Sequence, residues 1–243
     1  RGKIISFEYD KRGNRLKQTS PTGKIINFAY DSTNLLTSLT DPSSAVTSFA
    51  YNNRNLLASK TDSLSAVTTY GYDSAGRLNS RTDRKNHTVT YGYTSDSKIS
   101  TITYPDASTT TFTYDALDRV TQMVDSLGTT TYVYDDVNRT ITVTDANGFV
   151  VIHKYDSVGN LLELTYPGNK KVTYTYDQLN RLKTVTNWLD QTATYNYDNA
   201  GRLSSLTNFN GSVTSYGYDN ANRLTSLDNK KADASVIATY AYT

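Results

Sequence analysis

The sequence repeats itself about every 21 residues. The anchor of each repeat is a tyrosine, usually followed by aspartate: Tyr9, Tyr30, Tyr51, Tyr72, Tyr93, Tyr114, Tyr134, Tyr155, Tyr176, Tyr197, Tyr218 and Tyr242. Successive anchors lie 21 residues apart five times, 20 once, 21 four times and finally 24. Another ring stands two residues before the anchor in every repeat except one, where His153 takes its place. A fixed period of this length is typical of proteins in which each repeat is one supersecondary unit.

Each repeat contains two turn signals. Four residues after the anchor stands Gly or Asn in nine of eleven repeats: Gly13, Asn34, Asn55, Gly76, Asn138, Gly159, Asn180, Gly201 and Asn222. These two residue types best tolerate positive φ, so we expect a left-handed turn residue there. A second glycine turn follows about fourteen residues after the anchor, at Gly23, Gly128, Gly148 and Gly211.

Two turns per repeat leave room for two strands of about six residues. The approach to the anchor alternates, as in Val172-Thr173-Tyr174-Thr175-Tyr176, so one face carries the rings and the other carries small or polar residues. Each repeat is therefore predicted to be a β-hairpin. The fold class is all-β: tandem hairpins in one long antiparallel sheet, with no helix required. We expect equivalent tyrosines to stack against one another in ladders.

The composition agrees with strands. Thr and Ser make up 38 and 24 of the 243 residues, and 21 of the 23 acidic residues are Asp. β-Branched, aromatic and turn residues are thus favoured over straight-chain helix formers, which nearly excludes an all-helical fold. The net charge is +2, and the charged residues are spread along the chain. No basic patch that would indicate nucleic-acid binding is therefore seen. No apolar run approaches the roughly 18 residues of a membrane span.

The number of strands constrains the shape. About 23 strands at roughly 4.8 Å each would make a flat strip about 110 Å long. Open twisted sheets rarely exceed about ten strands without curling or closing. We therefore expect residues 1–243 to form a single array of about 11.5 repeats, part of a longer chain, that coils into a spiral or shell-like wall.

The motif Tyr-Asp-x-x-Gly-Arg-Leu is intact at Tyr72–Leu78 and Tyr197–Leu203. Together with the Tyr-x-Tyr-Asp approach, it resembles the YD repeats of Rhs proteins, toxin-complex components, wall-associated toxins and teneurins. The turns Tyr104-Pro105-Asp106 and Tyr166-Pro167-Gly168 are similar to that family as well. The resemblance covers essentially the whole chain. It implies a hairpin strip that spirals into a hollow shell, which encloses a C-terminal toxin or builds a cell-surface scaffold. The family's Asp-Pro-x-Gly region and a variable C-terminal effector are not seen in this sequence.

The chemistry-bearing residues favour structure over catalysis. A catalytic site is a unique constellation, whereas the anchor tyrosine recurs twelve times and Asp follows it in nine of these copies. We interpret recurring pairs such as Asp73 with Arg77 as turn-capping and pairing residues. His87 and His153 lie in different repeats, so they form no zinc or hydrolase cluster, and His153 is expected to pack in the ring slot. Without Cys, thiol chemistry and disulfides are excluded. We expect no enzyme activity, cofactor or metal.

Trp188 is the one candidate recognition residue. It follows Asn187 in a turn where most repeats have Pro, Ser or Ala. There it either stacks on a sugar or partner protein or folds back onto neighbouring strands.

The leading hypothesis is a structural segment of a secreted or cell-surface protein that builds either a shell around a C-terminal toxin cargo or an extracellular surface or fibre scaffold. Its strand edges are expected to pair with further repeats of the same chain or with neighbouring subunits. The alternative is a carbohydrate-binding or adhesion module that recognises polysaccharide with exposed Tyr-rich faces.

The ends carry a further expectation. The chain starts within a strand at Arg1-Gly2-Lys3-Ile4-Ile5 and stops just after Tyr242, without capping repeats. Uncapped strands expose unpaired N–H and C=O groups, so we expect the segment to self-associate when expressed alone.

Overall fold

The structure is a computed structural model that describes residues 4–242. The expected strand start at Arg1, Gly2 and Lys3 lies outside the described residues. The chain divides into two compact units, each described here by itself. Unit 1 comprises the residues up to Thr113 together with Val124–Ser126, and unit 2 comprises Tyr114–Met123 together with the residues from Leu127 on.

The described residues of both units are built almost entirely from short strands. Unit 1 contains β1 (Ser6–Tyr9), β2 (Arg15–Thr19), β3 (Ile25–Tyr30), β4 (Leu36–Thr40), β5 (Val46–Tyr51), β6 (Leu57–Thr61), β7 (Val67–Tyr72), β8 (Leu78–Thr82), β9 (Thr88–Tyr93), β10 (Ile99–Thr103) and all but the last residue of β11 (Thr109–Tyr114). Unit 2 contains β13 (Gly128–Asp135), β14 (Thr140–Thr144), β15 (Val150–Tyr155), β16 (Leu161–Tyr166), β17 (Lys170–Tyr176), β18 (Leu182–Thr186), β19 (Thr192–Tyr197), β20 (Leu203–Thr207), β21 (Val213–Tyr218), β22 (Leu224–Lys230) and β23 (Val236–Ala241). Strand β12 (Val120–Asp125) has residues in both units, and a 3-10 turn, η1, spans Pro167–Asn169.

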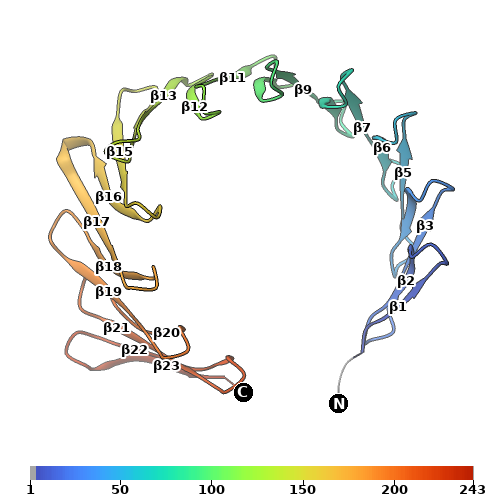
Figure 1. Cartoon of the computed structure of the whole chain (residues 1–243). Coiled ribbons are helices and arrows are strands. Elements are labelled where there is room, and N and C mark those ends of the chain that lie inside the picture. Colours follow the sequence, from blue (N-terminus) through green and yellow to red (C-terminus); the bar gives the residue numbers. More distant parts are fainter. Residues whose placement is uncertain (1–3, 243) are drawn as a thin grey trace. The chain divides into compact units, whose positions relative to one another are not determined.

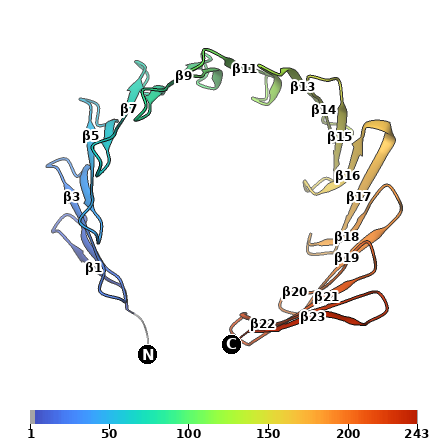
Figure 2. The same ribbon diagram turned by 180° about the vertical axis from the view of Figure 1, so that it is seen from behind.

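Within each unit, every strand pairs antiparallel with the next strand along the chain. Examples are β7 with β8 and β8 with β9 in unit 1, and β19 with β20 and β20 with β21 in unit 2. Figures 1 and 2 show the hairpins following one another in chain order. The expected all-β hairpin fold is confirmed. No helix in the described part of the chain is long and apolar enough to cross a membrane.

The turns at both ends of the hairpins share one backbone geometry. After β19, the Asp198 amide donates to the Arg202 carbonyl (2.9 Å) and the Gly201 amide donates to the Asp198 carbonyl (2.9 Å). After β20, Asn208, Gly211 and Ser212 repeat this pattern. It is a type I turn followed by one left-handed residue, a common three-residue hairpin loop.

The expected left-handed residue is confirmed in eight of the nine repeats in which Gly or Asn predicted it: Gly13, Asn34, Asn55, Gly76, Gly159, Asn180, Gly201 and Asn222. Ser97 and Asp118 adopt the same conformation where Gly or Asn is absent. At the second turn, Gly23, Gly148 and Gly211 are left-handed too. Gly128 is instead the first residue of β13, with φ 126°.

The prediction for Asn138 is wrong, because Arg139 takes the left-handed conformation (φ 53°) in its place. In most hairpins a β-bulge lies immediately before the anchor, as between Asn196 and Tyr197 in the pairing of β19 with β20. The hairpin of β13 and β14 pairs without a bulge through Asp135↔Thr140. Residues 140–144, Thr-Ile-Thr-Val-Thr, alternate strictly, so no bulge is needed to keep the aliphatic residues on one face. The extra residue then lies in the turn, and the left-handed position moves by one.

Some of the strands that lead to an anchor, such as β3 and β5, alternate in exposure as expected. In β3, Ile26, Phe28 and Tyr30 are half-buried, while the residues between them are exposed. Among the described residues only Val172, Ala193 and Thr110 are buried, and none has a fully buried large side chain. The half-buried ring face thus takes the place of a layered core.

Candidate functional site

The first turn of most repeats is organised by a carboxylate. Asp198 Oδ1 accepts hydrogen bonds from the amides of Ala200 and Arg202, both at 2.9 Å. Its Oδ2 accepts the Arg202 Nε–H at 2.7 Å. The hydrogen bond from the Arg202 amide, followed by that from its side chain, lowers the pKa of Asp198. The same arrangement occurs in the pairs Asp73–Arg77, Asp115–Arg119, Asp177–Arg181 and Asp219–Arg223. The expected Asp–Arg pairing is therefore confirmed.

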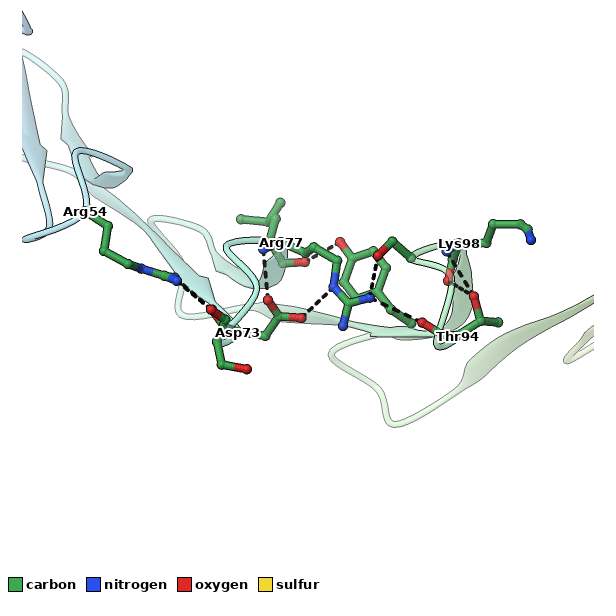
Figure 3. Close-up of polar contacts among 9 residues, drawn as sticks. Arg54, Asp73, Arg77, Thr94 and Lys98 are labelled. Carbon is green, nitrogen blue, oxygen red and sulfur yellow. Dashed lines mark hydrogen bonds and ion pairs between the residues drawn. The ribbon is translucent and has the colours of Figure 1, made fainter. Parts of the chain in front are cut away.

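The arginine also reaches the next repeat. Arg202 Nη1 donates to the Asp219 carbonyl (3.1 Å) and to Asn222 Oδ1 (2.8 Å). Its guanidinium lies 4.6 Å from the centre of the Tyr218 ring. In Figure 3, Arg77 of unit 1 likewise lies between Asp73 of its own turn and Thr94 of the next repeat.

The anchor tyrosine completes the contact. The Tyr218 hydroxyl donates to the Leu203 carbonyl at 3.0 Å. We call this combination the inter-repeat clamp. It has two parts: an arginine that lies over the ring of the next anchor, and the hydroxyl of that anchor, which donates a hydrogen bond to the preceding hairpin. The arginine part occurs in Arg77–Tyr93, Arg119–Tyr134, Arg181–Tyr197 and Arg202–Tyr218, at 4.2–4.6 Å. The hydroxyl bond, 2.6–3.0 Å long, occurs at Tyr51, Tyr72, Tyr93, Tyr134, Tyr176, Tyr197 and Tyr218.

The prediction that equivalent tyrosines stack in ladders is wrong for the clamped repeats. Equivalent anchors are separated by two strand spacings, close to 10 Å, whereas ring pairs need centres about 4.5–7 Å apart. The second strand of each hairpin therefore lies between successive rings. In the four clamped repeats the neighbour of the anchor ring is an arginine, a contact worth about 0.5–1 kcal/mol at an exposed site. The sequence carried a signal for it, because Arg77, Arg181 and Arg202 each stand 16 residues before an anchor.

Trp188 lies in the turn between β18 and β19 and is 50% exposed. Its ring packs edge-on against Tyr166 of the previous repeat, with centres 6.3 Å apart, and Lys170 Nζ lies 5.6 Å from the indole centre. One side of the indole is thus held by the neighbouring turn. Its role in recognition stays a prediction.

The two histidines are far apart in the chain and in different hairpins. His153 pairs with Ile141 on β14 and with Leu164 on β16. Its Nδ1 is buried without a hydrogen bond in the described structure. His87 lies in a turn, with Nδ1 3.5 Å from an Asp83 carboxylate oxygen. Within residues 4–242, no group of three or more His, Asp or Glu side chains is arranged to hold a metal ion.

The repeat geometry agrees with a comparison to known families. The model of the teneurin YD-shell family matches residues 1–193. The chain belongs to the teneurin YD-shell family. A second model, of the RHS repeat, matches residues 197–233. No curated protein matches the chain. As a YD-shell segment, the chain is a structural repeat domain, in agreement with the repeats of the sequence.

Solved structures of similar fold include those of TcdB2-TccC3 and of a Tc holotoxin pore. The crystal structure of TcdB2-TccC3 without its hypervariable C-terminal region matches 98% of this chain with a TM-score of 0.81 and 14% identity. That of TcdB2-TccC3-TEV matches the same share with a TM-score of 0.80 and 14% identity. The Photorhabdus luminescens Tc holotoxin pore matches 98% with a TM-score of 0.56 and 15% identity. This chain spans only 15–16% of those chains, so the likeness concerns the fold alone.

Proposed function

We propose that this YD-shell segment forms part of the wall of a hollow protein shell that encloses a toxin polypeptide. The observation that carries the proposal is the inter-repeat clamp. Because the clamp ties successive hairpins together within the plane of one sheet layer, the array can extend as a wall without a second layer. Membership of the YD-shell family supports this role. So does the fold shared with TcdB2-TccC3, one structure of which is described as lacking a hypervariable C-terminal region.

In this proposal the protein acts outside the cell, as a secreted or surface protein. Its strand edges pair with further repeats of the same chain or with neighbouring subunits, because exposed edges otherwise lead to aggregation. The role is mechanical and requires no enzyme activity of the segment. Nothing in the comparisons favours the carbohydrate-binding alternative.

Electron microscopy and limited proteolysis of the full-length protein test the proposal. We expect a hollow, β-rich body and a protease-resistant internal segment that becomes sensitive once urea opens the wall. A solid body in electron microscopy would contradict the proposal. So would a protein in which the protease cleaves every domain equally fast in buffer and in urea.

We also propose that Trp188 is a surface contact for a partner molecule. Half of its surface is accessible, and Lys170 beside it adds a positive charge. Because it is the only tryptophan of the chain, its fluorescence reports on this turn alone. The protein is titrated with candidate oligosaccharides and with the cargo polypeptide. We expect one of these ligands to shift the fluorescence emission of Trp188 saturably. An unchanged spectrum with all of them would assign Trp188 to packing against Tyr166.

A further inference from the structure

The repeat of Arg139 carries the arginine of the clamp but does not form the clamp. The pairing of β14 with β15 places Arg139 opposite Tyr155, and the Tyr155 amide donates to the Arg139 carbonyl at 2.9 Å. On either side along the chain, Arg119 covers Tyr134 at 4.2 Å and Arg181 covers Tyr197 at 4.3 Å. In the described structure, the guanidinium of Arg139 has no hydrogen bond, ion pair or ring contact, and the Tyr155 hydroxyl has no hydrogen bond.

The backbone explains the missing contact. Arg139 has the left-handed conformation, with φ 53°, whereas Arg119 and Arg181 follow the left-handed residue of their turns. The Cα–Cβ bond of Arg139 therefore leaves the turn in a different direction. In this turn, Asn138 Nδ2 donates to Asp135 Oδ2 at 2.7 Å, the role that an arginine Nε plays elsewhere.

A cavity of about 350 Å³, wide open to solvent, lies at this position in unit 2. Its lining includes Tyr155, Thr140 and three aspartates, Asp135, Asp136 and Asp156. Of the two arginines that also line it, Arg119 is already bound to Asp115 and Asp136. The Asp156 carbonyl corresponds to the Asp219 carbonyl that accepts Arg202 Nη1 in a complete clamp. The cavity thus offers a ring with no arginine over it and a backbone acceptor. Three carboxylates are among its lining residues, with Arg119 and Arg139 as the cations.

We propose that this cavity binds the guanidinium group of an arginine side chain from another polypeptide, which stacks on Tyr155 where the repeat's own arginine does not. Carboxylates and an aromatic face attract a cation, and the planar guanidinium fits both the ring and the carbonyl acceptors. The four complete clamps show the same group in the same surroundings. The inference does not depend on the shell proposal, because it rests on the cavity alone.

The test is an NMR titration of the protein with N-acetyl-L-arginine methylamide, observing the Tyr155 ring. The matched probe is N-acetyl-L-citrulline methylamide, which has the same shape without the charge. We expect saturable shifts with the arginine probe and binding at least roughly tenfold weaker with citrulline. Arg139→Ala should retain binding. Equal binding of the two probes, or shifts that do not saturate, would overturn the proposal.

Two variants locate the site. Replacing Asn138→Gly, Thr140→Leu and Ile141→Asn copies Gly76-Arg77-Leu78-Asn79, so that Arg139 should form the clamp itself and binding should be lost. Tyr155→Leu should abolish binding, while Tyr197→Leu, which removes an already covered ring, should leave it intact. Circular dichroism confirms that each variant is folded. Undiminished binding in a folded Tyr155→Leu protein would show that the ring is not the site.

Discussion

At the residue scale, an aspartate or asparagine begins most turns and satisfies their backbone amides. Asp73, Asp177 and Asp219 all have lowered pKa values, caused mainly by hydrogen bonds from the following backbone amide or from the arginine of the same turn. The carboxylate form is therefore favoured more strongly in the folded chain than in the unfolded chain. In Asn52 and Asn187, an amide oxygen accepts the same backbone bonds without a charge.

These pKa shifts predict acid sensitivity. Because the pKa is lower in the folded chain, the carboxylates stabilise the fold above their unfolded pKa of about 3.9, and this stability is lost as the pH falls through the folded pKa. We expect urea midpoints that stay constant from neutral pH to about pH 5 and fall below about pH 4. A variant with Asp198→Asn and Asp219→Asn should show a smaller fall. A midpoint that rises on acidification would contradict the role of the turn carboxylates.

The anchor hydroxyl gives a second prediction. Tyr197→Phe removes the 2.9 Å hydrogen bond to the Leu182 carbonyl but keeps the ring under Arg181. We expect a loss of about 0.5–1.5 kcal/mol in the free energy of unfolding, measured by urea denaturation. Tyr195→Phe, in the same strand, is the control, because the Tyr195 hydroxyl has no hydrogen bond within residues 4–242. Equal effects of the two changes would show that the anchor bond adds no stability.

At the element scale, the hairpin is decided by where the backbone must turn. Gly201 is left-handed with φ 81°, whereas Gly217 lies within β21 at ordinary φ. A Cβ at Gly217 would meet the Ser226 hydroxyl. In other repeats, however, alanine already occupies the equivalent place, with Ala29 opposite Ser38. A methyl group opposite a serine is therefore compatible with this pairing.

This difference predicts opposite tolerance to alanine. Gly201→Ala should lower the free energy of unfolding by about 1 kcal/mol or more, because an L-residue is strained in the left-handed region. Gly217→Ala should change it by less than about 0.5 kcal/mol. Urea denaturation of both proteins measures the effect. A greater loss of unfolding free energy for Gly217→Ala than for Gly201→Ala would mean that β21 and β22 cannot adjust to the added methyl group.

At the scale of the whole molecule, strands within each unit, such as β7 and β8 or β19 and β20, pack mainly on the strands before and after them. Stability in such an array is close to a sum of repeat and neighbour terms. Removal of one complete repeat should therefore leave the remaining contacts intact, because the same clamp is re-formed at the new junction.

Deletion of residues 177–197 tests this, since it joins Tyr176 directly to Asp198 and keeps the repeat in phase. We expect unchanged β-sheet circular dichroism per residue and a denaturant m-value lower by roughly a twelfth, in proportion to the chain removed. Deletion of residues 187–196, half a repeat, is the control and should disrupt the array because it reverses the direction of the following strands. Unfolding of the in-phase deletion would contradict a modular array.

The sequence by itself determined the hairpins, the turn positions and the aromatic face. Alternation and left-handed preference act within a few residues, so Gly76, Gly201 and the Tyr-x-Tyr approach report directly on the backbone around them. The Asp–Arg pairs were also predictable, because both partners belong to one turn. The shift from Asn138 to Arg139 was missed, although the strict alternation of residues 140–144 carried the signal for it.

Only the tertiary structure decided what covers each ring. The repeat period places tyrosine after tyrosine, but the strand between them separates the rings and brings Arg202 onto Tyr218 instead. The same holds for the uncovered Tyr155 and for the buried Nδ1 of His153, whose neighbours Ile141 and Leu164 come from two other strands. Contacts across strands depend on register and on the direction in which a side chain leaves the backbone. Neither quantity is contained in the local pattern of residues.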